Sequence, residues 1–382
     1  MRKTLKLLLG LAIGMLVGLC IGFAIAMIFT DITASDFIGR LGSLDILSMG
    51  STIILSTVAL IATGLIQIIL HESGHLAGGL LSGYRFVSFR IFSLTLFRRN
   101  GRWMLQRFSL AGTGGQCIMT PPDLPYRQVP FILYNAGGAA FNIITVATAA
   151  IIMATTNTTD SAFAFMYLFF TIITGLWFAL INGIPMKING ITNDAYNILL
   201  LWRNPESRRH FVLQLRCNAL CQNGIRPKDM PAEWFAEEND TPVTDAMHAC
   251  TRLMAATRLL DTGDTTGAHA MLDNIVENSG SMPELIINEA SIELIFTSLI
   301  SGHTEKAREM LTPKLTAYIR NSAHTISSKQ RVLCSMALYL DNDPGKANDI
   351  YRHVCDNRNK YLMQGEVAMD IELMQNMLRQ KA

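Results

Sequence analysis

Two histidines and a glutamate at residues 71–75 have the spacing of metal ligands with a general base beside them. In the sequence His71-Glu72-Ser73-Gly74-His75 the histidines are four residues apart. On a helix both imidazoles therefore share one face, with Glu72 next to them. The HExxH pattern on a helix typically holds Zn²⁺ through its histidines and uses the glutamate as general base. The alternative is a helix that ends at His71 with a solvated cap beyond it.

A catalytic zinc site needs a third protein ligand and an open position for water. Asp194 is the one carboxylate in the stretch that follows the apolar segment 162–181, beyond a break from Pro185 to Gly190. If this stretch folds back to lie beside His71 and His75, Asp194 completes the metal site. The alternative is that Asp194 caps the N-terminus of a helix over 195–202, a common role for aspartate.

The elements that must position these residues are predicted to be membrane helices. Half of the 382 residues are hydrophobic, 16% are charged, and the mean hydropathy is +0.28. Apolar runs predict four spans, over about 5–29, 52–81, 131–154 and 162–181. Ionisable residues within a span mark a functional site by default. The net charge of +2 is too small to suggest nucleic acid as a partner.

The charge of the loops predicts the orientation in the cell membrane. The loop over 31–48 holds three aspartates and one arginine, whereas the segment 84–129 is rich in arginine. Because positive charge collects on the cytoplasmic side, we expect a multi-pass protein with a cytoplasmic N-terminus and C-terminal domain. His71 and His75 would then lie in the cytoplasmic half of the membrane.

A membrane-associated β-hairpin is predicted directly after the histidine helix. Residues 84–97 and 103–110 are rich in aromatic and β-branched side chains, and Asn100-Gly101 between them is a strong turn signal. The hairpin would offer an edge to an extended peptide, or it would simply lie on the membrane surface. The glycines of residues 112–116 let the backbone approach a neighbour closely. This stretch lacks the lysine and spacing of a phosphate-binding loop.

Three asparagines are candidates for binding substrate. Asn135 and Asn142 lie in the third expected span among small residues, and Asn182 ends the fourth. Small residues allow close helix packing, and asparagine can hydrogen-bond across such a contact. Packing alone would explain the glycines, whereas amides at the depth of the histidines suggest support for a ligand.

This combination resembles the site-2 protease family of intramembrane zinc metalloproteases. His71, Glu72 and His75 match the first motif of the family, and Gly138 and Asn142 loosely match a Gly-Pro-x-x-x-Asn-like motif in a middle span. The resemblance covers roughly residues 49–204.

The third motif of that family is Asn-x-x-Pro followed by a metal-binding aspartate. Asn182 and Pro185 match it, and the resemblance implies that Asp194 is the ligand. Two departures are the longer distance from the proline to the aspartate and Ala195 in place of the usual glycine. In addition, Ala139 stands where the middle motif usually has proline. The longer spacing is similar to bacterial branches associated with peptide maturation.

The chain changes composition after residue 204. We expect a membrane-embedded metalloprotease domain over 1–204 and a soluble, all-α, helical-repeat-like domain over 205–382. Within the latter, turns precede Ala268, Ala307 and Ala347, which are 39 and then 40 positions apart. This spacing suggests stacked tetratricopeptide-like hairpins that could bind a peptide or protein partner. An irregular helical bundle is the alternative.

Taken together, these patterns predict an α-helical polytopic membrane protein that acts as an intramembrane zinc endopeptidase. It would bind one Zn²⁺ per chain and cleave membrane-associated or membrane-spanning peptides near the cytoplasmic face. The alternative is a non-catalytic membrane receptor or transporter-associated subunit that uses the helical repeats for binding.

Overall fold

A computed structural model describes residues 46–99, 101–108, 114–156, 161–188, 190–236, 243, 245–278, 280 and 282–381. The chain divides into two compact units after Ile61, and each is described by itself. The described part of the first unit is the beginning of helix α3 (Ile46–Leu81). The expected first span over 5–29 lies outside the described residues, as does most of the loop after it.

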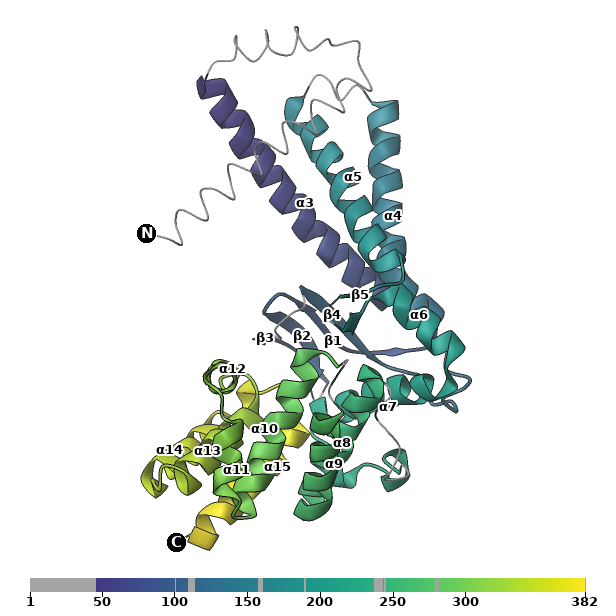
Figure 1. Cartoon of the computed structure of the whole chain (residues 1–382). Coiled ribbons are helices and arrows are strands. Elements are labelled where there is room, and N and C mark those ends of the chain that lie inside the picture. Colours follow the sequence, from purple (N-terminus) through teal and green to yellow (C-terminus); the bar gives the residue numbers. More distant parts are fainter. Residues whose placement is uncertain are drawn as a thin grey trace. The chain divides into compact units, whose positions relative to one another are not determined.

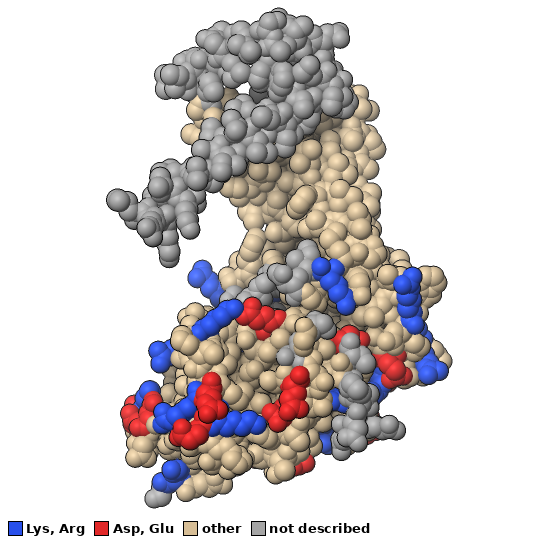
Figure 2. Space-filling model, in the orientation of Figure 1, with Lys and Arg blue, Asp and Glu red and all other residues tan. Residues whose placement is uncertain are grey.

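Among the described residues, three helices are long and apolar enough to cross a membrane, and they match the second, third and fourth expected spans (Figure 1). They are α3, α4 (Ile132–Thr155) and α5 (Ala162–Gly183). Large apolar side chains on α4 and α5, such as Ile151 and Trp177, are exposed. On the face in Figure 2, lysine, arginine, aspartate and glutamate gather over the sheet and the C-terminal helices. This distribution supports membrane association of the apolar helices.

Helices α3 and α4 touch backbone to backbone at glycines. A Cβ atom on Gly74 would lie 2.1 Å from the carbonyl oxygen of Gly137, and one on Gly78 would lie 2.0 Å from that of Leu133. Neither position has room for any side chain. Small residues at a helix crossing let the two axes approach closely in lipid. The crossing therefore brings the HExxH turn of α3 directly against the start of α4.

A four-stranded antiparallel sheet follows α3, with strand order β3-β2-β1-β4. The strands are β1 (Arg85–Ile91), β2 (Leu94–Arg99), β3 (Arg102–Arg107) and β4 (Gly115–Thr120). The predicted hairpin is confirmed between β2 and β3, where Arg99 pairs with Arg102. Its extent was wrong, because a second tight turn at Phe92, with φ +50°, divides the first predicted strand into β1 and β2.

A short hairpin and helix connect α5 to the C-terminal half. Strands β5 (Lys187–Ile188) and β6 (Ile191–Thr192) pair, and Gly190 between them has φ +80°, a value that favours glycine. Helix α6 (Asp194–Arg203) follows, and then α7 (Pro205–Gln222) begins. Phe211 and Val212 of α7 share a buried core with Tyr84 and Tyr134. The expected boundary after residue 204 therefore lies between two helices that pack in one core.

The remaining described residues are mainly helical. The helices are α8 (Ala246–Thr262), α9 (Thr265–Glu277), α10 (Glu284–Ile300), α11 (Thr304–Met310), α12 (Pro313–Ser322), α13 (Ser327–Tyr339), α14 (Pro344–Asp356) and α15 (Gln364–Lys381), with short 3₁₀ turns at 227–229, 232–234 and 358–360. They enclose one large apolar core. Ala268 of α9, Ala307 of α11 and Ala347 of α14 are all completely buried in it. The small residue at each of these three positions thus serves close helix packing.

Candidate metal centre

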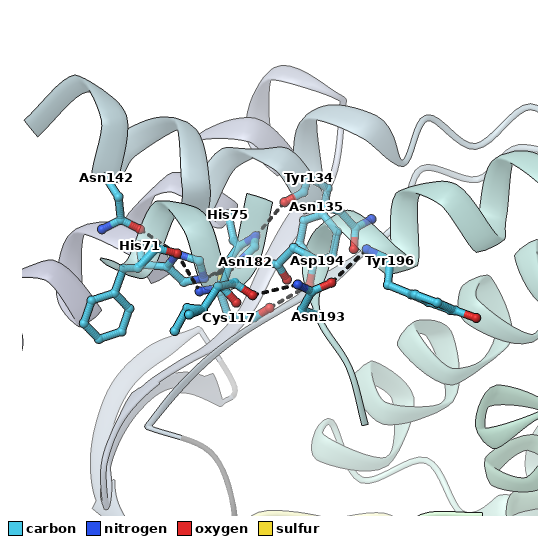
Figure 3. Close-up of polar contacts among 12 residues, drawn as sticks. His71, His75, Cys117, Tyr134, Asn135, Asn142, Asn182, Asn193, Asp194 and Tyr196 are labelled. Atoms are coloured by element: carbon cyan, nitrogen blue, oxygen red, sulfur yellow. Dashed lines mark hydrogen bonds and ion pairs between the residues drawn. The ribbon is translucent and has the colours of Figure 1, made fainter. Parts of the chain in front are cut away.

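The structure brings His71, His75 and Asp194 together (Figure 3). The Nε2 atoms of the two histidines are 3.1 Å apart. The Oδ2 atom of Asp194 lies 3.2 Å from Nε2 of His71 and 3.3 Å from Nε2 of His75. Three ligands of a tetrahedral ion with bonds of about 2.0–2.1 Å are separated by about 3.3–3.4 Å. The three side chains therefore have the size and shape of one face of a tetrahedral first-row metal site.

The second ring nitrogen of His71 is fixed by Asn142. Nδ1 of His71 donates to Oδ1 of Asn142 at 2.9 Å. The amide nitrogen of Asn142 donates in turn to the backbone carbonyl of Gln67 at 3.1 Å and to its side-chain oxygen. Since a backbone carbonyl can only accept, this contact sets which end of the amide faces His71. A ligating histidine characteristically has such a partner, which orients the ring and fixes its tautomer.

His75 is held in the same way from the start of α4. Its Nδ1 donates to the backbone carbonyl of Tyr134 at 2.7 Å. The hydroxyl of Tyr134 donates to the carbonyl of Cys117 on β4 at 2.7 Å. Tyr134, at the start of α4, is therefore hydrogen-bonded both to α3 and to the edge strand β4. Both imidazoles are left with Nε2 facing Asp194.

The electrostatics of this cluster fit a cation. With the Nδ1 atoms engaged, the Nε2 atoms of both imidazoles face one carboxylate oxygen of Asp194. Three lone pairs within 3.3 Å repel one another unless a cation or proton lies between them. Burial raises the pKa of Asp194, but where a proton lies there, the hydrogen bonds and positive charge of His71 and His75 lower it to about 2. The carboxylate is thus in its ionised form, the form that binds metal.

Asn193 places Asp194 in the site. Its side-chain oxygen accepts from Tyr196 N at 2.9 Å and caps α6. Its amide nitrogen donates to the carbonyls of Ile181 and Ile184. The alternative role of Asp194 as the helix cap is therefore wrong, because Asn193 has that role. Asp194 is the first helical residue, and its carboxylate is turned toward the histidines.

Glu72 is buried beside the histidines, against the first residue of β4. A Cβ atom on Gly115 would lie 2.5 Å from Oε1 of Glu72. The glycine-rich stretch before β4 thus makes the close approach that its composition predicted. Arg90 of β1 is a charged neighbour of Glu72. Its guanidinium donates to the carbonyls of Phe92 and Gly115. The buried cation Arg90 is thus held near Glu72.

The three asparagines predicted to bind substrate have different surroundings. Asn142 supports His71, as described above. The amide nitrogen of Asn135 donates to the carbonyl of Phe131, and that of Asn182 donates to the carbonyl of Phe178, each within its own helix. Figure 3 shows both residues in the same close-up as the histidines and Asp194. A substrate role for these residues stays a prediction.

Sequence reasoning missed Gln67, Tyr134, Gly115, Arg90 and Asn193 as parts of the site. Gln67 lies one helical turn before His71, so helix periodicity could have marked it. Asn193 precedes a helix, where asparagine is a frequent cap. Gly115 was recognised as a point of close approach, but its partner was not. For Tyr134, which acts through its backbone carbonyl, and for Arg90, the sequence carries no signal.

Comparison of the chain with protein-family models, with curated proteins and with solved structures gave no match.

Proposed function

We propose that the chain is an intramembrane zinc metalloendopeptidase of the site-2 protease type. The observation that carries this proposal is the triangle of His71, His75 and Asp194 atoms with sides of 3.1–3.3 Å, with Glu72 beside it. It lies at the end of a helix long enough to span a membrane. Two histidines and a carboxylate form a common catalytic zinc set, whereas Mg²⁺ and Ca²⁺ prefer oxygen ligands.

The roles of the residues follow from this arrangement. When bound, zinc would supply a water of lowered pKa and polarise the peptide carbonyl. Glu72 takes the proton from the attacking water and then delivers it to the leaving amine. Asn142 and the Tyr134 carbonyl keep both imidazoles in the tautomer that presents Nε2. Gly115 leaves space for the Glu72 carboxyl group.

The substrate in this proposal is a membrane-associated or membrane-spanning peptide. A helical peptide must unwind before its carbonyls can be attacked, and an unwound segment needs new hydrogen-bond partners. Strand β4 is at the edge of its sheet and begins against Glu72. Its outer edge can therefore pair with an extended peptide beside the general base. In this proposal the side-chain oxygens of Asn135 and Asn182 accept hydrogen bonds from freed backbone groups.

The proposal also includes the arrangement in the cell. We infer that the chain is a multi-pass protein of the cell membrane with its N-terminus and C-terminal domain in the cytoplasm. The helical pairs of the C-terminal half would be stacked tetratricopeptide-like units. Their buried alanines at similar spacing support this class. Because the expected ligands His71, His75 and Asp194 lie together with Glu72 beside them, we favour an enzyme over a non-catalytic receptor or transporter-associated subunit.

Metal analysis combined with cleavage assays tests the proposal. The purified chain should contain about one zinc and should cleave members of a library of single-span peptides in detergent, as read by mass spectrometry. Glu72→Gln should keep the metal and lower the cleavage rate by about 10²–10⁴-fold. Asp194→Ala should lose both metal and cleavage. Cleavage at the wild-type rate by Glu72→Gln, or full metal and activity in Asp194→Ala, would overturn the proposal.

A further inference from the structure

A partly open cavity of about 310 Å³ lies between β4 and the C-terminal helices. Its sheet wall includes Gln116 and Ile118, and its helical wall includes Asn218 and Gln222 of α7 and Glu366 of α15. A water molecule occupies about 30 Å³ of liquid. The cavity therefore has room for one long side chain together with several waters. We refer to it as the β4 cavity.

The β4 cavity lies on the opposite face of the strand from Glu72. Successive residues of a strand point to opposite faces. Cys117 and Met119 are buried in the core that contains Tyr134, whereas Gln116 and Ile118 line the cavity. A peptide that pairs with the outer edge of β4 would likewise send alternate side chains to the cavity side. Since a strand rises about 3.3 Å per residue, these positions lie within a few residues of Gly115.

Two polar groups at the β4 cavity lack partners. Gln222 is 6% exposed, and among the described residues neither its amide nitrogen nor its amide oxygen has a hydrogen-bond partner. Buried polar groups are nearly always paired in folded proteins. Within the described part of the chain, Glu366 forms no ion pair with a cation. By contrast Glu289, also in the wall, is paired with Lys329 at 2.6 Å.

The charges around Glu366 favour a positive ligand. The carboxylates that act on it are Asp370, Glu293 and Glu289, and the cation is Lys329. Arg331 is already paired with Glu293 and Asp370, each at 2.6 Å. Glu366 and the three neighbouring carboxyl groups thus outnumber the two cations in this region, Lys329 and Arg331.

The sheet wall does not supply the missing positive charge. Arg90 pairs in register with Gln116, but its guanidinium donates to the carbonyl oxygens of Phe92 and Gly115, and Arg90 is not part of the cavity wall. The cavity therefore offers a carboxyl group to a positive ligand.

We infer that the β4 cavity is a specificity subsite that takes a lysine or arginine side chain of the peptide substrate, with Glu366 as its acceptor and Gln222 as a partner for polar groups beside it. This inference rests on the proposed function, because it assumes that a peptide pairs with β4. It assigns part of the substrate preference to the C-terminal half of the chain. A basic residue close to the cleavage site becomes the predicted feature of the substrate.

The binding should depend on pH. Burial, reinforced by the neighbouring Asp370 and Glu293, raises the pKa of Glu366 to about 8. At pH 7 the carboxyl group is therefore largely neutral and must lose a proton to pair with a cation. Lysine stays charged up to about pH 10. Binding of a basic side chain should thus tighten as the pH rises from 6 to 8.5 and should release a proton.

A double-mutant cycle on the full-length chain tests the inference. The background is Glu72→Gln, which leaves peptides uncleaved, and the probes are two fluorescent single-span peptides from the library that differ by Lys→Met at one position. Replacing the peptide lysine should weaken binding about 10- to 100-fold, the size expected for a charge-assisted hydrogen bond. Adding Glu366→Gln should weaken binding of the lysine peptide equally and leave the methionine peptide unchanged. Glu305→Gln, an exposed carboxyl group on α11, is the control and should change neither.

The outcomes separate this inference from the proposed function. If the wild-type chain cleaves these peptides but no lysine position couples to Glu366, the subsite is wrong and the protease stands. If lysine and Glu366 couple but the wild-type chain cleaves nothing, the protease proposal fails and the β4 cavity is a binding site for a basic side chain of a peptide that is not cleaved. The comparison of the two peptides needs no change at Glu366, so a folding defect in Glu366→Gln would not hide the preference for lysine.

Discussion

Single residues in this site act by leaving space as well as by supplying ligands. Gly115 has no side chain where Glu72 lies, and Gly138 has none where His71 lies. A Cβ on Gly138 would be 2.5 Å from Cε1 of the His71 ring. The His71 ring is also fixed by Asn142. The two glycines therefore set the positions of the Glu72 carboxyl group and of the His71 ring.

A methyl group at residue 115 should separate metal binding from catalysis. In Gly115→Ala the new Cβ would displace the Glu72 carboxyl group, while the three metal ligands keep their own contacts. We expect zinc content near one per chain and cleavage reduced by at least about 10²-fold, the lower range for loss of a general base. Gly114→Ala is the matched control, because its Cβ would have an ordinary contact of 3.7 Å with Ile68. Equal activity in the two variants would mean that Glu72 does not act from its observed place.

At the scale of elements, one helix crossing and one short connecting segment bring Asp194 to the two histidines. The α3–α4 crossing fixes the HExxH turn, and the segment from Ile181 to Asn193 returns the chain to it. Asn193 connects both ends of this segment through its contacts with Ile181, Ile184 and Tyr196. The position of Asp194 is thus set by the N-terminus of α6.

Removing this connection should weaken the metal site more than it weakens the helix. Asn193→Ala and Asn204→Ala each remove an N-cap, of α6 and α7 respectively, and each should cost about 1 kcal/mol of stability. Only Asn193→Ala also frees Asp194, so zinc affinity should fall in that variant alone, by about 10- to 100-fold as for other supporting residues. Competition with a chelator measures the affinity. A similar loss in Asn204→Ala would assign the effect to general destabilisation.

At the scale of the whole molecule, the sheet and the C-terminal helices are joined by specific contacts. Arg99 donates to the carbonyl oxygens of Asn359 and Tyr361 at 3.3 and 3.2 Å, and Gln106 donates to that of Asn359 at 3.0 Å. Arg216 of α7 donates to the carbonyls of Pro122 and Leu124. The helical half is thus attached to the strand side of the candidate metal site. This attachment makes the β4 cavity possible.

The stability of this assembly should fall as the pH rises from about 4.5 to 8. The folded-state pKa of Glu366 is raised, mainly by burial, from 4.5 to about 8. Between these values the folded state retains a proton that the unfolded state has lost, so unfolding becomes easier with rising pH. In Glu366→Gln this contribution is absent. Melting temperatures can be followed by circular dichroism in detergent. Between pH 5 and pH 8.5 the melting temperature of the wild type should therefore fall relative to that of Glu366→Gln. A difference independent of pH would contradict the shifted pKa.

The sequence by itself determined what depends on local order along the chain. The four-residue spacing of His71 and His75 places both rings on one helix face whatever the rest of the fold. The lengths of the apolar runs determine α3, α4 and α5, because a helix in lipid must satisfy its own backbone. The Asn100-Gly101 turn likewise predicted the β2–β3 hairpin. The extra turn at Phe92 was missed, since a phenylalanine with positive φ has no sequence signal.

Tertiary structure alone decided which residues from distant segments meet. Asp194 was expected at the site from topology, but only the fold shows that Asn193 caps the helix and frees the carboxylate. Asn142 could have faced a substrate or a neighbour, and its contact with His71 depends on the glycine crossing of α3 and α4. The meeting of Gly115 with Glu72 and of Gln222 with Glu366 depends on packing between segments far apart in the chain. Such contacts follow from the summed packing of all elements, which no local pattern of residues contains.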